Sequence, residues 1–214
     1  TFEDRFKADK IHGIYVNMIE INESEMDEAA PYIATDPTTG LPFYHSEVNT
    51  YLARFWDPAW WEYRLSTVRD IETMDFIFSD VMILRRFLWI NGNLPEEIDT
   101  DTEWRTNILD IIAYLRNYIP SSILAANSII DQELGSDYDG FDAIGDDYAD
   151  YGVLEGFISG TEENSMRQLR QMQIVYKATT SQKRIFVIAK INPLLDSSQE
   201  RIDYLAKFLM VSDL

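Results

Sequence analysis

The sequence contains no cysteine and only two histidines, His12 and His45, which lie far apart. The absence of cysteine excludes disulfides, a thiolate nucleophile and cysteine metal sites. The two histidines form no HExxH pattern, and no GxSxG elbow is present. These absences remove the common zinc-protease and serine-hydrolase chemistries, and the sequence predicts neither a metal nor another cofactor.

Long apolar runs and glycine-rich loops are also missing. No stretch approaches the roughly 18 uncharged apolar residues of a membrane-spanning helix, so we expect no membrane insertion. None of the 9 glycines builds a phosphate-binding loop after an apolar run, which argues against the nucleotide-binding open sheets.

Basic residues are scarce, because 18 Lys and Arg stand against 37 Asp and Glu, for a formal net charge of -19. Such a chain repels phosphate backbones, so nucleic acid is excluded as a favoured partner. With 214 residues and 46% hydrophobic content, the chain can fill one core, and we predict a single domain over 1–214. The abrupt ends suggest a fragment of a longer polypeptide.

Short apolar runs alternate with longer amphipathic ones, the pattern of βαβ units and a parallel sheet. Six runs are predicted strands: His12–Ile19, Tyr51–Trp56, Phe76–Met82, Ser122–Ala126, Tyr151–Ile158 and Arg184–Ile191. Four helices are predicted around them: from Asp57 to about Ile71, from about Glu103 to Ile119, from about Glu162 to Ala178, and from Ser197 onward.

The fold class predicted from this order is α/β, with a (β/α) TIM-type barrel preferred to an open sheet. Six strands are about two fewer than the eight of a complete barrel. The barrel is therefore expected to be incomplete in this chain, or to be closed by another chain. An open-sheet α/β enzyme remains the alternative fold.

Two acidic residues at predicted strand ends are the candidate catalytic groups. Asp80 follows the apolar run FIFS, and Glu155 lies inside the apolar run GVLEGFIS. Functional groups of a parallel barrel gather at the carboxyl ends of its strands. Glycosidic cleavage needs two such carboxyl groups, one to protonate the leaving oxygen and one to attack the sugar or activate water. A structural salt bridge is the alternative reading for either acid.

Four further polar residues are candidates for substrate binding. Asn127 and Asn192 end predicted strands and can bond sugar hydroxyls, although asparagine there also forms turns. Lys190 could offset one of the acids, and Asp57 is read both as a helix cap and as a residue of the cleft. The acidic stretch Asp137–Asp150 has the composition of a calcium loop without EF-hand spacing, so a solvated loop is preferred.

The middle of the chain resembles a group of glycoside hydrolases with TIM-barrel catalytic domains, related in pattern to the endo-alpha-1,4-polygalactosaminidases. The resemblance rests on Asp36, Gly40 and Pro42, then on Asp57, Pro58 and Trp60, then on FIFSD ending at Asp80, and on GVLEGFIS. It spans about Tyr32 to Ile191. Phe76 departs from the glycine usual in that group, as does Ser128 after Asn127. The resemblance implies a polysaccharide hydrolase with Asp80 and Glu155 as its acids.

Two hypotheses about function follow. The first is a glycoside hydrolase acting on an extracellular or surface polysaccharide. The second is a non-catalytic barrel that binds carbohydrate or serves as a structural module among other chains, for example in a virion. An enzyme requires both acids to open into one cleft, whereas a structural module can bury them.

Overall fold

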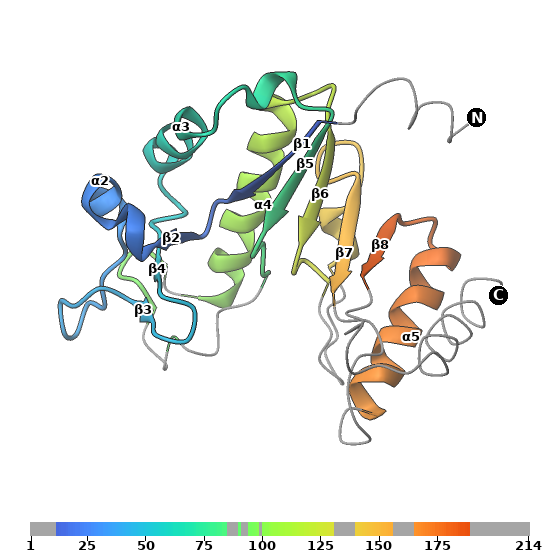
Figure 1. Ribbon diagram of the computed structural model, residues 1–214. Helices are drawn as coiled ribbons and strands as arrows, with labels where there is room; N and C mark the ends of the chain where they lie inside the picture. Colours follow the sequence, from blue (N-terminus) through green and yellow to red (C-terminus); the bar gives the residue numbers. More distant parts are fainter. Residues whose placement is uncertain are drawn as a thin grey trace, which may run out of the picture.

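The structure of this protein is a computed structural model that describes residues 12–84, 90, 94–98, 100–130, 140–155 and 165–188, without the side chains of residues 155 and 165–168. It is a mixed α/β fold containing two sheets (Figure 1). No helix within these ranges has the length and apolar character needed to cross a membrane.

The larger sheet has five parallel strands in the order β1-β5-β6-β7-β8. They are β1 (Gly13–Asn17), β5 (Phe76–Asp80), β6 (Ile123–Asn127), β7 (Tyr151–Glu155) and β8 (Ile185–Ile188). Five of the six predicted strands are thereby confirmed. Each new strand is added on the same side of the last, so the described part of the sheet contains no order reversal of the kind that marks doubly wound folds. The described strands do not close into a ring.

A smaller antiparallel sheet corrects the sixth predicted strand. It has the order β2-β4-β3, with β2 (Glu20–Asn22), β3 (Tyr44–His45) and β4 (Thr50–Leu52). The run Tyr51–Trp56 was predicted to be a parallel barrel strand, which is wrong. Its first residues belong to β4, whose Leu52 pairs antiparallel with Glu20, about thirty residues earlier in the chain. Local apolar content could not indicate this long-range partner.

The helices agree with the sequence more closely. The described helical segments are η1 (Glu23–Glu25), α2 (Met26–Ala29), η2 (Ala30–Tyr32), α3 (Pro58–Thr67), η3 (Ile71–Thr73), α4 (Asp101–Tyr118), η4 (Phe141–Ala143) and α5 (Ser165–Thr180). Thr100 and Glu103 cap α4 reciprocally. The helix α3 ends earlier than predicted, because Val68 is already extended and Asp70 adopts a left-handed φ of 58°. The predicted helix from Ser197 lies outside the described residues.

One face of the parallel sheet carries the main core. Ile77, Leu124 and Leu154 are buried there in one cluster with Trp104 and Ile108 of α4, which runs beside the sheet (Figure 1). Strand alternation puts these three side chains on the same face.

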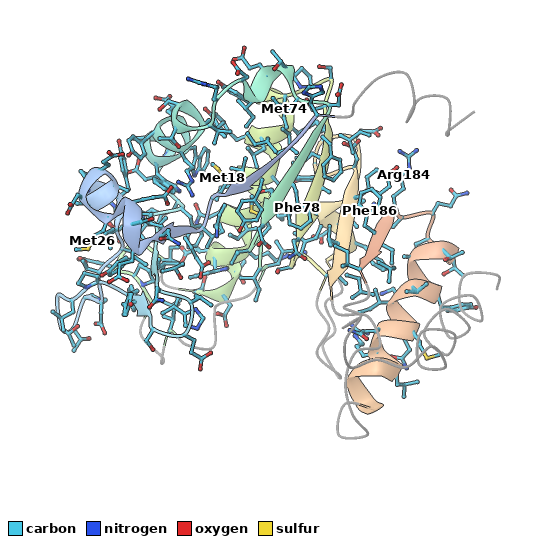
Figure 2. All side chains as sticks on the ribbon, in the orientation of Figure 1. Met18, Met26, Met74, Phe78, Arg184 and Phe186 are labelled. Carbon is cyan, nitrogen blue, oxygen red and sulfur yellow. The ribbon has the colours of Figure 1, made fainter. Side chains whose placement is uncertain are left out.

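The opposite face of the sheet is apolar but much more open. It carries Tyr15, Phe78 and Phe186, the last two labelled in Figure 2. Tyr15 is 56% exposed and Phe186 is 38% exposed. Because the strands are parallel, their carboxyl ends all lie along the same edge of the sheet. The residues of the candidate site lie along this carboxyl edge.

Candidate active site

Three polar residues end neighbouring strands at the carboxyl edge of the parallel sheet. Asn17 ends β1, Asp80 ends β5 and Asn127 ends β6. Asn17 and Asp80 are paired in register. Because parallel strands all end at one edge, residues distant in sequence become neighbours there. Two predicted site residues, Asp80 and Asn127, are thus brought together.

Asp80 is held by three hydrogen bonds. The Tyr15 hydroxyl donates to Oδ2 at 2.9 Å, while the Asn127 amide donates to Oδ1 at 2.7 Å and the Val81 backbone N–H donates to Oδ1 at 2.8 Å. Asp80 is the acceptor in all three bonds. Its side chain is only partly buried, so the fixed carboxylate still faces open space.

Both strand ends turn sharply after their polar residue. Val81 follows Asp80 with φ 61°, and Ser128 follows Asn127 with φ 67°. The Asn127 Oδ1 accepts the Ser128 N–H at 2.9 Å, which leaves the amide nitrogen to point at Asp80. Left-handed backbone is costly for residues other than glycine, above all for a β-branched one. Backbone strain of this kind concentrates at functional sites.

A second carboxyl group, Glu20, lies beside this edge. Glu20 is 7% exposed at the start of β2. It accepts hydrogen bonds from the Asn17 amide at 3.3 Å and the Thr50 hydroxyl at 3.2 Å. The His45 Nδ1 lies 4.0 Å from its Oε1.

Burial raises the pKa of Glu20 above its usual value, and the negative charge of Asp80 adds to this effect. The hydrogen bonds from Asn17 and Thr50 and the charge of His45 act in the opposite direction but do not offset burial. Glu20 therefore keeps its proton to a higher pH than an exposed glutamate.

The two carboxyl groups line a common cavity of about 680 Å³. This volume lies within the range of roughly 300 to 1,000 Å³ that is usual for small-molecule sites. The lining residues come from β1, β2, η1, β4, α3, β5 and the adjoining loops: Tyr15, Val16, Asn17, Glu20, Asn22, Ser24, Glu25, Val48, Thr50, Arg64, Thr67, Val68, Asp80 and Val81.

Tyr15 lies on β1, the strand next to β5, and its hydroxyl holds Asp80. Burial, followed by the negative charge of Asp80, raises the pKa of Tyr15 to about 12. The hydroxyl therefore keeps its proton at neutral pH and remains a donor to Asp80. Its ring stacks on Phe78 at 6.1 Å between centroids.

Glu20, Tyr15 and Asn17 were missed by the sequence reasoning. A signal for Glu20 existed, because it directly follows the apolar run His12–Ile19, just as Asp80 follows its own apolar run. The burial of Glu20 depends on Thr50, which only the antiparallel pairing brings near. That contact has no local sequence pattern.

The other predicted residues lie elsewhere or outside the described part. Asp57 caps α3 by accepting the Ala59 N–H at 2.9 Å, and it is not among the cavity-lining residues. Glu155 is the last residue of β7, paired in register with Ile188, but its side chain is not among those described. Lys190 and Asn192 lie outside the described residues.

The acidic stretch 137–150 is described only from residue 140 onward. Two of its aspartates form ion pairs there: Asp142 with Arg105, and Asp150 with Arg116. Within the described ranges, no cluster of three acidic or histidine side chains could hold a metal ion.

Comparison with known proteins connects this geometry to one class of fold. No protein family and no curated protein matches the sequence. The structure is similar to the glycoside hydrolase domain of PelA from Pseudomonas aeruginosa, at 15% identity and TM-score 0.56, over 88% of this chain and 68% of that one. A variant of the same domain aligns at 14% identity and TM-score 0.58, over 92% of this chain and 72% of that one. At this identity the likeness concerns the fold alone: this chain has an α/β fold similar to that of the PelA domain.

Proposed function

We propose that this protein is a glycoside hydrolase that cleaves a polysaccharide with two carboxyl groups. The observation that carries the proposal is the placement of Asp80. It is fixed by three hydrogen bonds at the carboxyl edge of a parallel sheet, and it lines a cavity that contains a second, buried carboxyl group. Glycosidic cleavage in barrel enzymes uses two carboxyl groups at the carboxyl ends of the strands.

The parallel sheet is proposed to be part of a (β/α) barrel. A strand order that follows the chain order supports this, because right-handed crossovers then put successive helices on one face. The second face, with Tyr15, Phe78 and Phe186, would be the barrel interior. Large apolar side chains on alternate positions suit that interior.

Asp80 and Glu155 are the proposed catalytic pair. The strands β5 and β7 are separated only by β6, so their backbones lie about 9 to 10 Å apart. Alternation puts the backbone position of Glu155 on the same sheet face as Asp80. One carboxyl group would protonate the leaving oxygen and the other would attack the sugar or activate water.

Substrate binding is proposed for Asn127, Asp57, Lys190 and Asn192. Asn127 has the best support, since its amide already touches Asp80 and lies at the strand edge. A strongly acidic chain with a polysaccharide substrate suits an extracellular or surface location, and a glycan is the proposed partner rather than nucleic acid.

The proposal is tested by incubating the protein with acidic, amino-sugar and neutral polysaccharides and measuring released reducing ends. Asp80→Asn should abolish the release without lowering the melting temperature, and Glu155→Gln should do the same if Glu155 is the second catalytic carboxyl group. Asp110→Asn and Glu62→Gln are matched controls, because both residues are exposed on helices and absent from the cavity lining. Folded protein that binds a glycan of the panel and releases nothing would favour the non-catalytic module instead.

A further inference from the structure

We propose that Glu20 is the proton donor of the glycosidase reaction and that Asp80 is the carboxylate acting opposite to it. This inference rests on the proposed function and deepens it, because it assigns the acid role to a residue outside the predicted pair. Four observations carry it: the shared cavity, the burial of Glu20, its hydrogen-bond partners, and the absence of a lysine or arginine partner for Glu20 among the described residues.

Glu20 is held in place by neutral groups. The Asn17 amide and the Thr50 hydroxyl donate to its two oxygens from the end of β1 and from β4. They fix the orientation of the carboxyl group without supplying a formal charge. A proton donor needs this combination, since it must be positioned and yet keep its proton.

The arginine of the cavity does not pair with Glu20. Arg64 donates from Nε to the Asn17 carbonyl at 2.9 Å and from Nη1 to Glu25 at 2.7 Å. Among the described residues, the ion pair that Glu20 makes is with His45, at 4.0 Å. A buried acid paired to arginine would be a fixed anion, and Glu20 is not in that situation.

Glu20 and Asp80 have different environments within the cavity. Asp80 accepts three hydrogen bonds, including one from backbone, while Glu20 is desolvated and has its pKa raised. A proton donor in an active site is a carboxyl group that its surroundings keep protonated, as burial does for Glu20. Glu20 therefore suits the role of proton donor, and Asp80, which three donors hold in place, suits the role of nucleophile or base.

The chemical step balances with these two groups alone. The bond between the anomeric carbon and the leaving oxygen breaks, its electron pair stays on the oxygen, and the Glu20 proton moves to that oxygen. The anomeric carbon is attacked in one of two ways. Either an Asp80 oxygen forms a new bond to it, or a water oxygen does so while the water passes a proton to Asp80. In the first case, a water later attacks the anomeric carbon, its proton moves to the Glu20 carboxylate, and the bond between the anomeric carbon and Asp80 breaks with its electron pair returning to Asp80.

Leaving-group dependence separates a proton donor from a structural residue. A dinitrophenolate leaves without protonation, whereas a methoxide does not. The test therefore uses the 2,4-dinitrophenyl and methyl glycosides of whichever sugar is released from the polysaccharide panel. Glu20→Gln should lower kcat/KM for the methyl glycoside by about 100-fold or more and change it far less for the dinitrophenyl glycoside.

Glu155→Gln is the direct comparison. If Glu155 donates the proton, the leaving-group dependence will appear in that variant and not in Glu20→Gln, which overturns the inference. Equal losses on both substrates in Glu20→Gln, or no loss on either, also overturn it. A wild-type protein inactive on every glycoside overturns the proposed function itself, a result distinct from these.

A second variant tests the role of Glu20 while leaving its carboxyl group in place. Thr50→Val has nearly the same shape but deletes a hydrogen bond that lowers the pKa of Glu20. The pKa of Glu20 should rise further, so the alkaline limb of kcat/KM should move to higher pH. His45, Asp80 and Tyr15 also face this group and stay unchanged in the variant. An alkaline limb that does not move contradicts the assignment.

Discussion

Ser128 offers a sharp test of the strand-edge geometry, because it occupies a conformation that suits glycine. Its φ is 67°, directly after the site residue Asn127. A non-glycine residue there costs about 1–2 kcal/mol. Glycine removes that strain but loses more freedom on folding, which offsets about 0.5–1 kcal/mol. Ser128→Gly should therefore stabilise the protein by about 0.5–1 kcal/mol.

The assay is thermal unfolding followed by circular dichroism. For a chain of this size the expected gain corresponds to a melting temperature about 1–4 °C higher. Ser66→Gly is the matched control, because Ser66 is exposed within α3 and glycine weakens a helix. That variant should lose about 0.5 kcal/mol.

If the backbone at Ser128 is strained, the melting temperature should rise in Ser128→Gly and fall in Ser66→Gly. A Ser128→Gly variant that melts at or below the wild-type temperature, while Ser66→Gly falls as expected, would refute the reasoning. The bond between Asn127 and Asp80 does not involve the Ser128 side chain, so the stabilised variant should retain its hydrolytic activity.

Three further predictions concern stability. Gly140→Ala should cost at least about 3 kcal/mol in chemical denaturation, because φ is 81° and a new Cβ would lie 1.8 Å from the Ile129 carbonyl oxygen; a normal midpoint would contradict this. Arg116→Lys should cost about 2 kcal/mol, because the guanidinium donates to two backbone carbonyls and pairs with Asp150, and urea unfolding that matches wild type would be the contrary result. The raised pKa of Glu20 means that its stabilising contribution is present below the ordinary glutamate pKa and is lost as pH rises through the folded-state pKa. Glu20→Gln should therefore gain in melting temperature relative to wild type between pH 4 and pH 8, and a difference that does not change with pH would count against it.

The helix α4 shows what the sequence could predict. Its capping box at Thr100 and Glu103 and its apolar period over eighteen residues are local signals, and the structure has both. Five parallel strands were predicted for the same reason, because each is a short apolar run between helices. The sequence signals for such elements lie within the element itself and the few residues on either side of it.

Features that depend on distant pairing could not be predicted in this way. The run Tyr51–Trp56 has the composition of a buried parallel strand, yet Leu52 pairs antiparallel with Glu20. The same pairing buries Glu20 against Thr50. The antiparallel pairing of β2 with β4 therefore explains both why Tyr51–Trp56 was assigned to the wrong sheet and why Glu20 was missed. Asp80 was found because its signal, an acid ending an apolar strand, is local.

The measurement that tests the central claim most directly is the release of reducing ends from a polysaccharide of the panel by wild type and by Asp80→Asn at matched melting temperatures. The account predicts steady release by wild type and release reduced to background in Asp80→Asn, since no other group would replace the fixed carboxylate. Undiminished release by Asp80→Asn, or none by well-folded wild type on any substrate, would contradict it.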